Sequence, residues 1–321
     1  MKKLKRTSMI SALVLTTTLS TQWSFATEYP SKTVDIIVGY SAGGGTDVMA
    51  RTIASHLETY LGEGAAAVVK NHPGAGGQIG FTKVATADAD GYTLGTMNLP
   101  AALSLTYDRA ADYDANSFTW LANFVSDPNT LVVSKASGIT SVEQLIKEAQ
   151  DKQGAMTVGL ASLGGNDHFS AIQFAKAANI KLTQVPFKGA AMARTSIMGG
   201  HINMGVMAFS QTVGFEEDLR VLAILSDKRL SQAPNVPTAK ELGYDVVMGS
   251  YRGLVAPAGL PDETLQVLRD ALDKLSVDPE FLADMKARGT PVHYQSGPAY
   301  EALAQEQNEI AAKIWQDTPW K

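Results

Sequence analysis

The stretch that decides the fold reads Val34-Asp35-Ile36-Ile37-Val38-Gly39-Tyr40-Ser41-Ala42-Gly43-Gly44-Gly45-Thr46-Asp47. An apolar run typical of a buried strand leads into three consecutive glycines, and apolar residues then recur at helical spacing up to Leu61. Glycine allows tight turning and close approach of a ligand. The start of a helix carries free N–H groups and a partial positive charge. The stretch therefore predicts a strand, a glycine-rich loop and a helix whose first turn can hold an anion.

A second unit of the same kind follows along the chain. The run Ala66–Lys70 leads into Gly74-Ala75-Gly76-Gly77-Gln78-Ile79-Gly80. This loop is not a dinucleotide fingerprint, because residue 79 is isoleucine where G-x-G-x-x-G needs glycine. Its backbone N–H groups suit a carboxylate instead. The two loops together predict one anion pocket built from neighbouring helix starts.

Strands alternate with helices from Val34 to Phe209, which predicts an α/β protein with mainly parallel sheets covered on both faces. One β-α-β-α-β series covers about residues 34–97, and a second covers about residues 156–225. We expect two doubly wound domains with binding loops at the carboxyl ends of their strands. Segments near 120–134 and 250–257 are expected to cross between them as hinge strands. Domain 1 is predicted at residues 27–125 plus 249–321, and domain 2 at residues 126–248.

The first 26 residues have the pattern of a secretory signal peptide. A basic start is followed by the mostly apolar or small residues Met9 to Leu19 and then by Ser24-Phe25-Ala26. A membrane anchor is the alternative, but the apolar stretch is short and is interrupted by threonines. We therefore expect a mature periplasmic protein that starts near Thr27.

The composition restricts the classes of binding partner and cofactor that the protein can have. Removing the four basic residues of the signal segment lowers the formal net charge from −5 to −9, which argues against nucleic acid and anionic membrane surfaces. Cysteine is absent, so there is no disulfide or thiol chemistry. The five histidines show no metal-ligand spacing, and we expect neither a metal nor another cofactor.

One motif favours catalysis. Gly39-Tyr40-Ser41-Ala42-Gly43 matches the G-x-S-x-G nucleophile elbow of serine hydrolases. The elbow normally follows several strands, whereas this one follows the first strand of the mature chain. A short pattern is also easily matched by chance. A secreted serine hydrolase that uses Ser41 is the alternative hypothesis, and we expect no catalytic residues.

Taken in order, the motifs resemble those of the Bug family, the periplasmic substrate-binding proteins of tripartite tricarboxylate transporters. The resemblance spans nearly the whole mature chain. It rests on the two glycine loops and on Asp90-Gly91-Tyr92-Thr93-Leu94, Val185-Pro186-Phe187-Lys188-Gly189-Ala190-Ala191, Leu222-Ala223-Ile224-Leu225-Ser226 and Val236-Pro237-Thr238 with Glu241-Leu242-Gly243.

The resemblance implies a two-domain clamshell of the type II periplasmic binding protein kind, with the ligand between the domains. It implies that the first two loops hold a carboxylate through Ser41, Gly43, Gly44, Gly45, Thr46, Asp47, Gly74, Ala75, Gly76, Gly77 and Gln78. From the residue types, Asp47 is expected to cap its helix rather than touch an anion. The far end of the ligand is expected to meet the second domain at Ser162, Gly165, Asn166, His168, Lys188, Gly189 and Ala190. Thr96 and Asn98, at the end of the third strand, are expected to line the cleft as well.

One departure from the family is that Gly165 stands where serine is common, so a hydroxyl contact is lost at the far end. The predicted function is capture of a small organic carboxylate and its delivery to the membrane permease subunits of a secondary transporter. The predicted ligands are a di- or tricarboxylate, an acidic amino acid or an aromatic acid, and the receptor is expected to be a monomer. A receptor for an ATP-driven importer is a further alternative.

Overall fold

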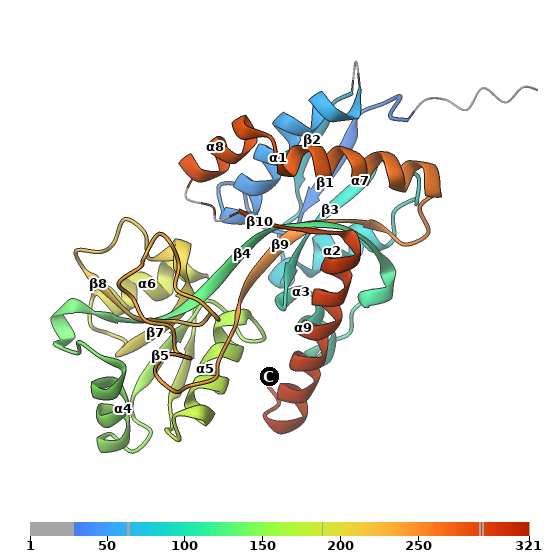
Figure 1. The fold of residues 1–321 in the computed structure, drawn as a ribbon. Coiled ribbons are helices and arrows are strands. Elements are labelled where there is room, and N and C mark those ends of the chain that lie inside the picture. The colour runs from blue at the N-terminus through green and yellow to red at the C-terminus, as the bar shows by residue number, and fades with distance from the viewer. Residues whose placement is uncertain (1–28, 63–64, 188, 289, 291, 321) are drawn as a thin grey trace, which may run out of the picture.

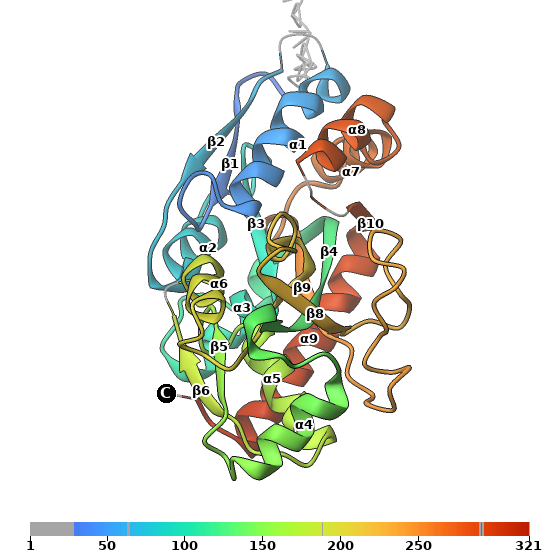
Figure 2. The same ribbon diagram turned by 90° about the vertical axis from the view of Figure 1, so that its left-hand side faces the viewer.

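The chain folds into two α/β lobes joined by two long strands (Figure 1). The computed structural model describes residues 29–62, 65–187, 189–288, 290 and 292–320. The expected signal segment, residues 1–26, lies outside the described residues. In Figure 2 the first lobe, with α1, α7 and α8, is at the top, and the second lobe, with α4 and α5, is at the bottom.

The first lobe is built on three parallel strands in the order β2-β1-β3. They are β1 (Val34–Val38), β2 (Ala67–Asn71) and β3 (Thr93–Leu99). Its helices and short 3-10 turns are α1 (Gly45–Leu61), η1 (Ala75–Gly77), α2 (Gln78–Ala85), α3 (Ala101–Asp108), α7 (Asp262–Ser276), α8 (Pro279–Ala287) and α9 (Gly297–Asp317). The predicted strand–glycine loop–helix units are therefore present, and α1 ends at Gly62, whose φ is 112°.

The second lobe repeats the same arrangement with parallel strands in the order β7-β5-β6. They are β5 (Thr157–Leu160), β6 (Thr183–Pro186) and β7 (Met204–Ala208). Its other elements are η3 (Lys135–Ser137), α4 (Val142–Asp151), α5 (Asn166–Ala177), α6 (Ala190–Met198), η4 (Phe209–Gln211) and β8 (Leu219–Ile224).

Two strands belong to both lobes. They are β4 (Phe118–Ser134), which follows η2 (Ala115–Ser117), and β9 (Gly249–Pro257). They pair antiparallel, and the path through the whole sheet is β2-β1-β3-β9-β4-β7-β5-β6. The β10 strand (Val292–Ser296) and β8 also pair antiparallel with β4. The sheets are thus mixed rather than mainly parallel, because a chain that crosses to the second lobe and returns must run in opposite directions.

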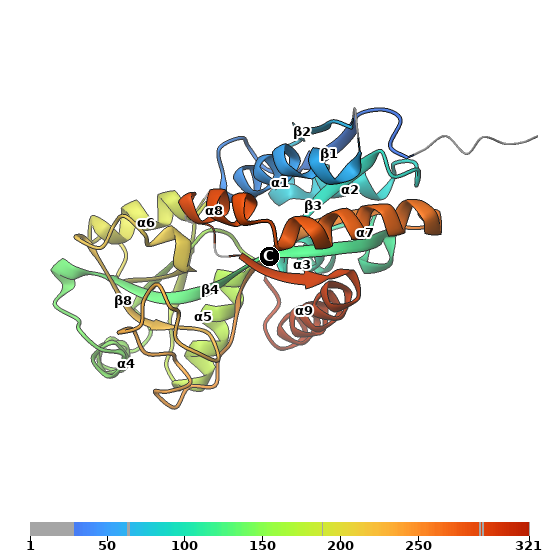
Figure 3. The ribbon, with the colours of Figure 1, turned by 45° about the horizontal axis from the view of Figure 1, so that its top comes forward.

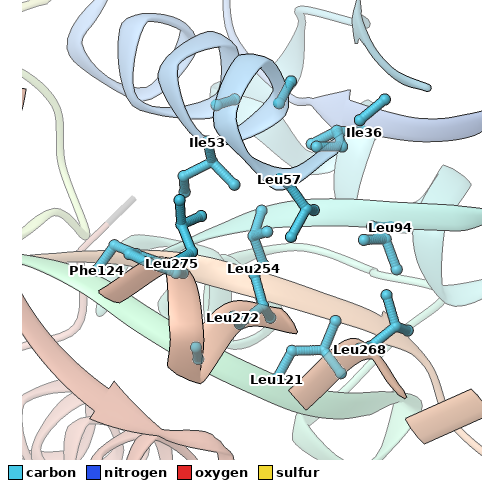
Figure 4. Close-up of a cluster of buried hydrophobic side chains, with 14 of the residues drawn as sticks. Ile36, Ile53, Leu57, Leu94, Leu121, Phe124, Leu254, Leu268, Leu272 and Leu275 are labelled. Carbon is cyan, nitrogen blue, oxygen red and sulfur yellow. The ribbon is translucent and has the colours of Figure 1, made fainter. Parts of the chain in front are cut away.

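Each lobe has its own apolar core. In the first lobe, α1 and α7 pack their apolar faces against β1, β3, β4 and β9, as Figure 4 shows for Ile53, Leu57, Leu254 and Leu272. In the second lobe, the residues of β5, β7, α4 and α5 form a separate cluster. The two cores are separate, and β4 and β9 are the strands that run through both lobes. The space between the lobes therefore lies beside these two strands.

The C-terminal segment connects the lobes at a third place. In Figure 3, α9 and α7 lie on opposite sides of β4. Beyond α9, the buried Trp320 ring lies 5.0 Å from the ring of Phe169 on α5, between ring centroids. Within the described residues, no helix combines the length and the apolar character needed to cross a bilayer.

Candidate functional site

Two hollows lie on opposite faces of the β4–β9 pair. Successive residues of a strand point to opposite faces, so Asp127 and Arg252 line one hollow, of about 190 Å³, whereas Ser126 and Tyr251 line the other, of about 570 Å³. The smaller cavity is the candidate site, because the N-termini of α1, α5 and α6 open on it from both lobes. Its wall is formed by Gly45, Thr46, Asn98, Asp127, Ala161, Asn166, Asp167, Ala190, Met207, Ala208, Gln211, Ser250 and Arg252.

Asp47 fixes the shape of the first glycine loop from behind. Its Oδ2 accepts hydrogen bonds from the N–H of Gly43 over 2.8 Å and from Nε of Arg51 over 3.0 Å, and its Oδ1 accepts one from Asn71 over 2.9 Å. Burial acts to raise the pKa of Asp47, but these hydrogen bonds hold it below its usual value. Asp47 is thus engaged behind the loop, and Gly45 and Thr46 of the first turn of α1 line the cavity.

The third glycine of this loop makes room for an arginine. A β-carbon at Gly45 would collide with Nη1 of Arg252, whereas one at Gly44 would meet only the Ser41 carbonyl oxygen, at 3.6 Å. The guanidinium of Arg252 therefore lies against the start of α1. Beside it, Nδ2 of Asn98 donates to Oγ1 of Thr46 over 2.8 Å.

The loop between β5 and α5 has the same architecture as the first glycine loop. Gly164 and Gly43 both have positive φ, 74° and 83°. The N–H of Gly164 donates to Nδ1 of His168, four residues on, over 3.0 Å, just as the N–H of Gly43 donates to Asp47. Position by position, Gly165 matches Gly44, Asn166 matches Gly45, and Asp167 matches Thr46.

His168 performs this structural role in its neutral form. Its Nδ1 accepts from Gly164, so its Nε2 carries the proton and donates to Oε1 of Gln184 over 2.8 Å. Burial disfavours the imidazolium and lowers the pKa of His168 to about 4. His168 thus shapes the loop and does not line the cavity.

The start of α5 carries its own anion. The Asp167 side chain is buried and lines the cavity. Burial raises its pKa to about 6, although the main-chain N–H groups of Ala161, Ser162, Asp167 and His168 hydrogen-bond to the carboxylate and oppose the rise. A β-carbon at Gly165 would lie 2.7 Å from Oδ1 of Asp167, so a larger residue there would have to displace that carboxylate.

A buried ion pair forms the floor of the cavity. Nη2 of Arg252 donates to Oδ2 of Asp127 over 2.8 Å, and the two residues are 6% and 0% exposed. Asp127 also accepts hydrogen bonds from the N–H and the hydroxyl of Ser210. Nε of Arg252 has no partner among the described residues. Burial lowers the pKa of the Arg252 guanidinium, and Asp127 opposes that shift.

The cavity brings together only part of the predicted site. Five predicted residues line it: Gly45, Thr46, Asn98, Asn166 and Ala190. The others that the structure describes lie outside the lining: Ser41, Gly43, Gly44, Asp47, Gly74, Ala75, Gly76, Gly77, Gln78, Thr96, Ser162, Gly165, His168 and Gly189. Lys188 lies outside the described residues.

The second glycine loop packs against the first lobe instead. A β-carbon at Gly39 would lie 2.7 Å from the carbonyl oxygen of Gly77. Nε2 of Gln78 donates to the carbonyl of Ala110 over 2.6 Å, which ties the loop to the segment after α3. The role of this loop in ligand binding stays a prediction.

The sequence analysis did not predict the charged residues that line the cavity. Asp127 is the only charged residue of segment 120–134, and Arg252 is the only one of segment 250–257. A charged residue is seldom fully buried unless it is paired. Two such residues in the two expected crossing strands were the available signal. Asp167 follows glycines closely in the sequence, as Asp47 does. The sequence alone therefore did not indicate that Asp167 lines the cavity whereas Asp47 does not.

Two other chemistries find no support in the part of the chain that the structure describes. Among these residues, no group of three or more metal-ligating side chains comes together. The hydrogen bonds found for the same residues include none between Ser41 and a histidine, which a serine hydrolase needs for its nucleophile.

The chain is similar to known proteins over most of its length. The family model described as "Tripartite tricarboxylate transporter family receptor" matches residues 49–318. Protein BugT of Bordetella pertussis is 30% identical over 274 residues, which cover 83% of this chain and 83% of BugT.

Solved structures show the same architecture. A TctC solute binding protein from Polaromonas is similar with a TM-score of 0.77 and 28% identity, over 90% of this chain and 99% of that one. An R. palustris protein solved with adipate is similar with a TM-score of 0.79 and 26% identity, over 90% of this chain and 97% of that one.

Proposed function

This chain belongs to the tripartite tricarboxylate transporter family of receptors, and from that premise we propose that it captures a small organic carboxylate in the cavity between its lobes. It is a solute receptor and not an enzyme, because the family is one of solute receptors. It acts in the periplasm as a monomer and delivers its ligand to the membrane permease subunits of the transporter. The lobes correspond to residues 27–125 plus 249–321 and residues 126–248.

The single observation that carries the proposal is the guanidinium of Arg252 beside the start of α1. Arginine offers five N–H donors in a planar fork that suits a carboxylate. Asp127 takes one of them, and Nε is among those left. The N-terminus of α1 adds free N–H groups and the positive end of its dipole at the same wall. A carboxylate bound there gains charge-assisted hydrogen bonds away from water.

The size of the cavity limits the ligand. Its volume is about 190 Å³, and its lining is largely polar or charged. That space suits an acid of a few carbons. The relative solved with adipate, a linear dicarboxylate, supports recognition of a carboxylate by this fold.

A thermal-shift screen on residues 27–321 tests the proposal. The panel contains short mono-, di- and tricarboxylates, acidic amino acids and aromatic acids. A ligand present at 100 times its dissociation constant stabilises the protein by about 2.7 kcal/mol. We expect at least one acid to raise the melting temperature, and uncharged esters of the same acids to have no effect.

Two variants locate the binding site. Arg252→Gln removes the cation from the cavity and should abolish the shift. Arg288→Gln removes an exposed arginine that pairs with Asp284 on α8, outside the cavity lining, and should leave the shift intact. An acid that stabilises a folded Arg252→Gln protein as strongly as the unaltered one would refute the proposed site.

A further inference from the structure

The two lobes present different groups to the cavity, where the charged residues are the Arg252–Asp127 ion pair and Asp167. The first lobe contributes the N-terminus of α1 with the neutral side chain of Thr46, together with the cation of Arg252. The second lobe contributes the N-terminus of α5, where the position that matches Thr46 is Asp167. Equivalent loops thus carry different groups at the same place.

Asp167 occupies the place that a ligand anion would take at α5. Its Oδ2 accepts a hydrogen bond from the N–H of Ala161, and the N–H groups of Ser162, His168 and its own residue also face the carboxylate. A helix start holds an anion through such N–H groups. At α5 these donors are already engaged by the chain itself, whereas the carboxylate of Asp47 in the first lobe is turned away from the cavity.

Resting on the proposed function, we propose that the receptor selects acids with a single carboxylate and excludes a second one at the second lobe. The carboxylate lies at Arg252 and the start of α1. The far end of the ligand, beside Asn166, Gln211 and Asp167, is an amide, hydroxyl or amino group. The substrate class is therefore short monocarboxylic acids with a polar, non-anionic far end.

The physical reason is the cost of two like charges in a small space. A cavity of about 190 Å³ brings both ends of a bound ligand within a few ångströms of its wall. Two like charges about 4 Å apart repel strongly when little water screens them. Since the N–H groups at the start of α5 are engaged, a second ligand carboxylate beside Asp167 would have only the start of α6 and the side-chain amides of Asn166 and Gln211 to set against the charge of Asp167.

Calorimetry with matched acids tests this inference on the unaltered protein. The probes are succinate and adipate, each compared with its own monoamide, which has the same length and nearly the same shape. We expect each monoamide to bind at least tenfold more tightly than its diacid at pH 7.5. A diacid that binds as tightly as its monoamide, or more tightly, would overturn the inference.

Asp167→Asn removes the charge that causes the exclusion. In this variant the ratio of monoamide to diacid affinity should move at least tenfold toward the diacid. Asp151→Asn makes the same chemical change on the exposed face of α4, where Asp151 pairs with Lys147, and should leave the ratio unchanged. A folded Asp167→Asn protein with the ratio of the unaltered protein would count against the inference.

The two proposals fail in different ways. If carboxylates bind but diacids are preferred, only the exclusion by Asp167 is wrong. If neither the monoamides nor the diacids bind, and no acid of the wider panel stabilises the protein, the proposed carboxylate receptor is wrong and the inference falls with it. Arg252→Gln should weaken both members of each pair together, because it acts on the carboxylate that they share.

Discussion

Arg252 and Asp127 form an ion pair, with Nη2 and Oδ2 2.8 Å apart, on the two antiparallel strands that join the lobes. Arg252 on β9 is in register with Val125 on β4, so the pair reaches diagonally across the ribbon. Both side chains are buried, and both face the cavity between the lobes. The hinge of the molecule and the charge of its site therefore depend on the same two residues.

Breaking this pair should cost much more than replacing it. Arg252→Met leaves Asp127 buried without its counter-charge, and the free energy of unfolding should fall by about 3–5 kcal/mol. The double change Arg252→Met with Asp127→Leu should cost clearly less than the two single changes added together. Urea denaturation of the four proteins in a double-mutant cycle measures this coupling, and additive single effects would contradict it.

Gly45 should tolerate no side chain, because Arg252 fills the space beside it. Gly45→Ala forces the guanidinium away from the start of α1, and we expect a loss of about 1–3 kcal/mol in stability and at least a tenfold loss in affinity for the best acid of the screen. Gly44→Ala is the matched control. Its β-carbon would have ordinary contacts, so it should cost no more than about 1 kcal/mol. Equal effects of the two changes would show that Arg252 is not the cause.

The sequence predicts the strand–loop–helix units well, because apolar periodicity and glycine pairs are local signals. It also predicts segments 120–134 and 250–257 as crossing strands, and these are β4 and β9. The site is harder. Residues such as Gly45 and Asn166 start helices, and a helix start can be found locally. Arg252 and Asp127 are 125 residues apart, and only the pairing of β4 with β9 brings them together.

The second glycine loop shows why a glycine-rich pattern is hard to interpret from sequence alone. Gly74 to Gln78 has the composition of an anion loop. Its glycines serve tight packing in the first lobe, since a β-carbon at Gly77 would lie 2.8 Å from the ring of Phe81. A sequence pattern does not distinguish a glycine that makes room for a ligand from one that makes room for the chain itself.

Trp320 should join the C-terminal segment firmly to the second lobe. The residue is 4% exposed, and its ring lies 5.0 Å from that of Phe169 and 4.8 Å from that of Trp315, between ring centroids. Trp320→Ala removes this packing and should lower the free energy of unfolding by about 3–5 kcal/mol. Trp320→Phe keeps part of the apolar contact and should cost less. Chemical denaturation gives both values, and an alanine variant as stable as the parent would contradict this role.

Asp167 and His168 should give the protein opposite responses to acid. The pKa of His168 is lowered to about 4, so between about pH 6.5 and 4 the unfolded chain takes up that proton first and stability falls as pH falls. The pKa of Asp167 is raised to about 6, so between about pH 6 and 4 the folded protein takes up that proton first and stability rises as pH falls. The two effects nearly cancel in the unaltered protein.

Replacing either Asp167 or His168 should reveal the effect of the other group on the pH dependence of stability. Relative to the unaltered protein, Asp167→Asn should lose about 2 kcal/mol of stability on going from pH 7 to pH 4.5, because the compensating proton uptake is gone. His168→Gln should gain a similar amount over the same range. Unfolding by urea at several pH values measures both differences. Parallel curves for all three proteins would mean that neither group titrates differently in the folded state, and that the charge at the start of α5 is not held away from water.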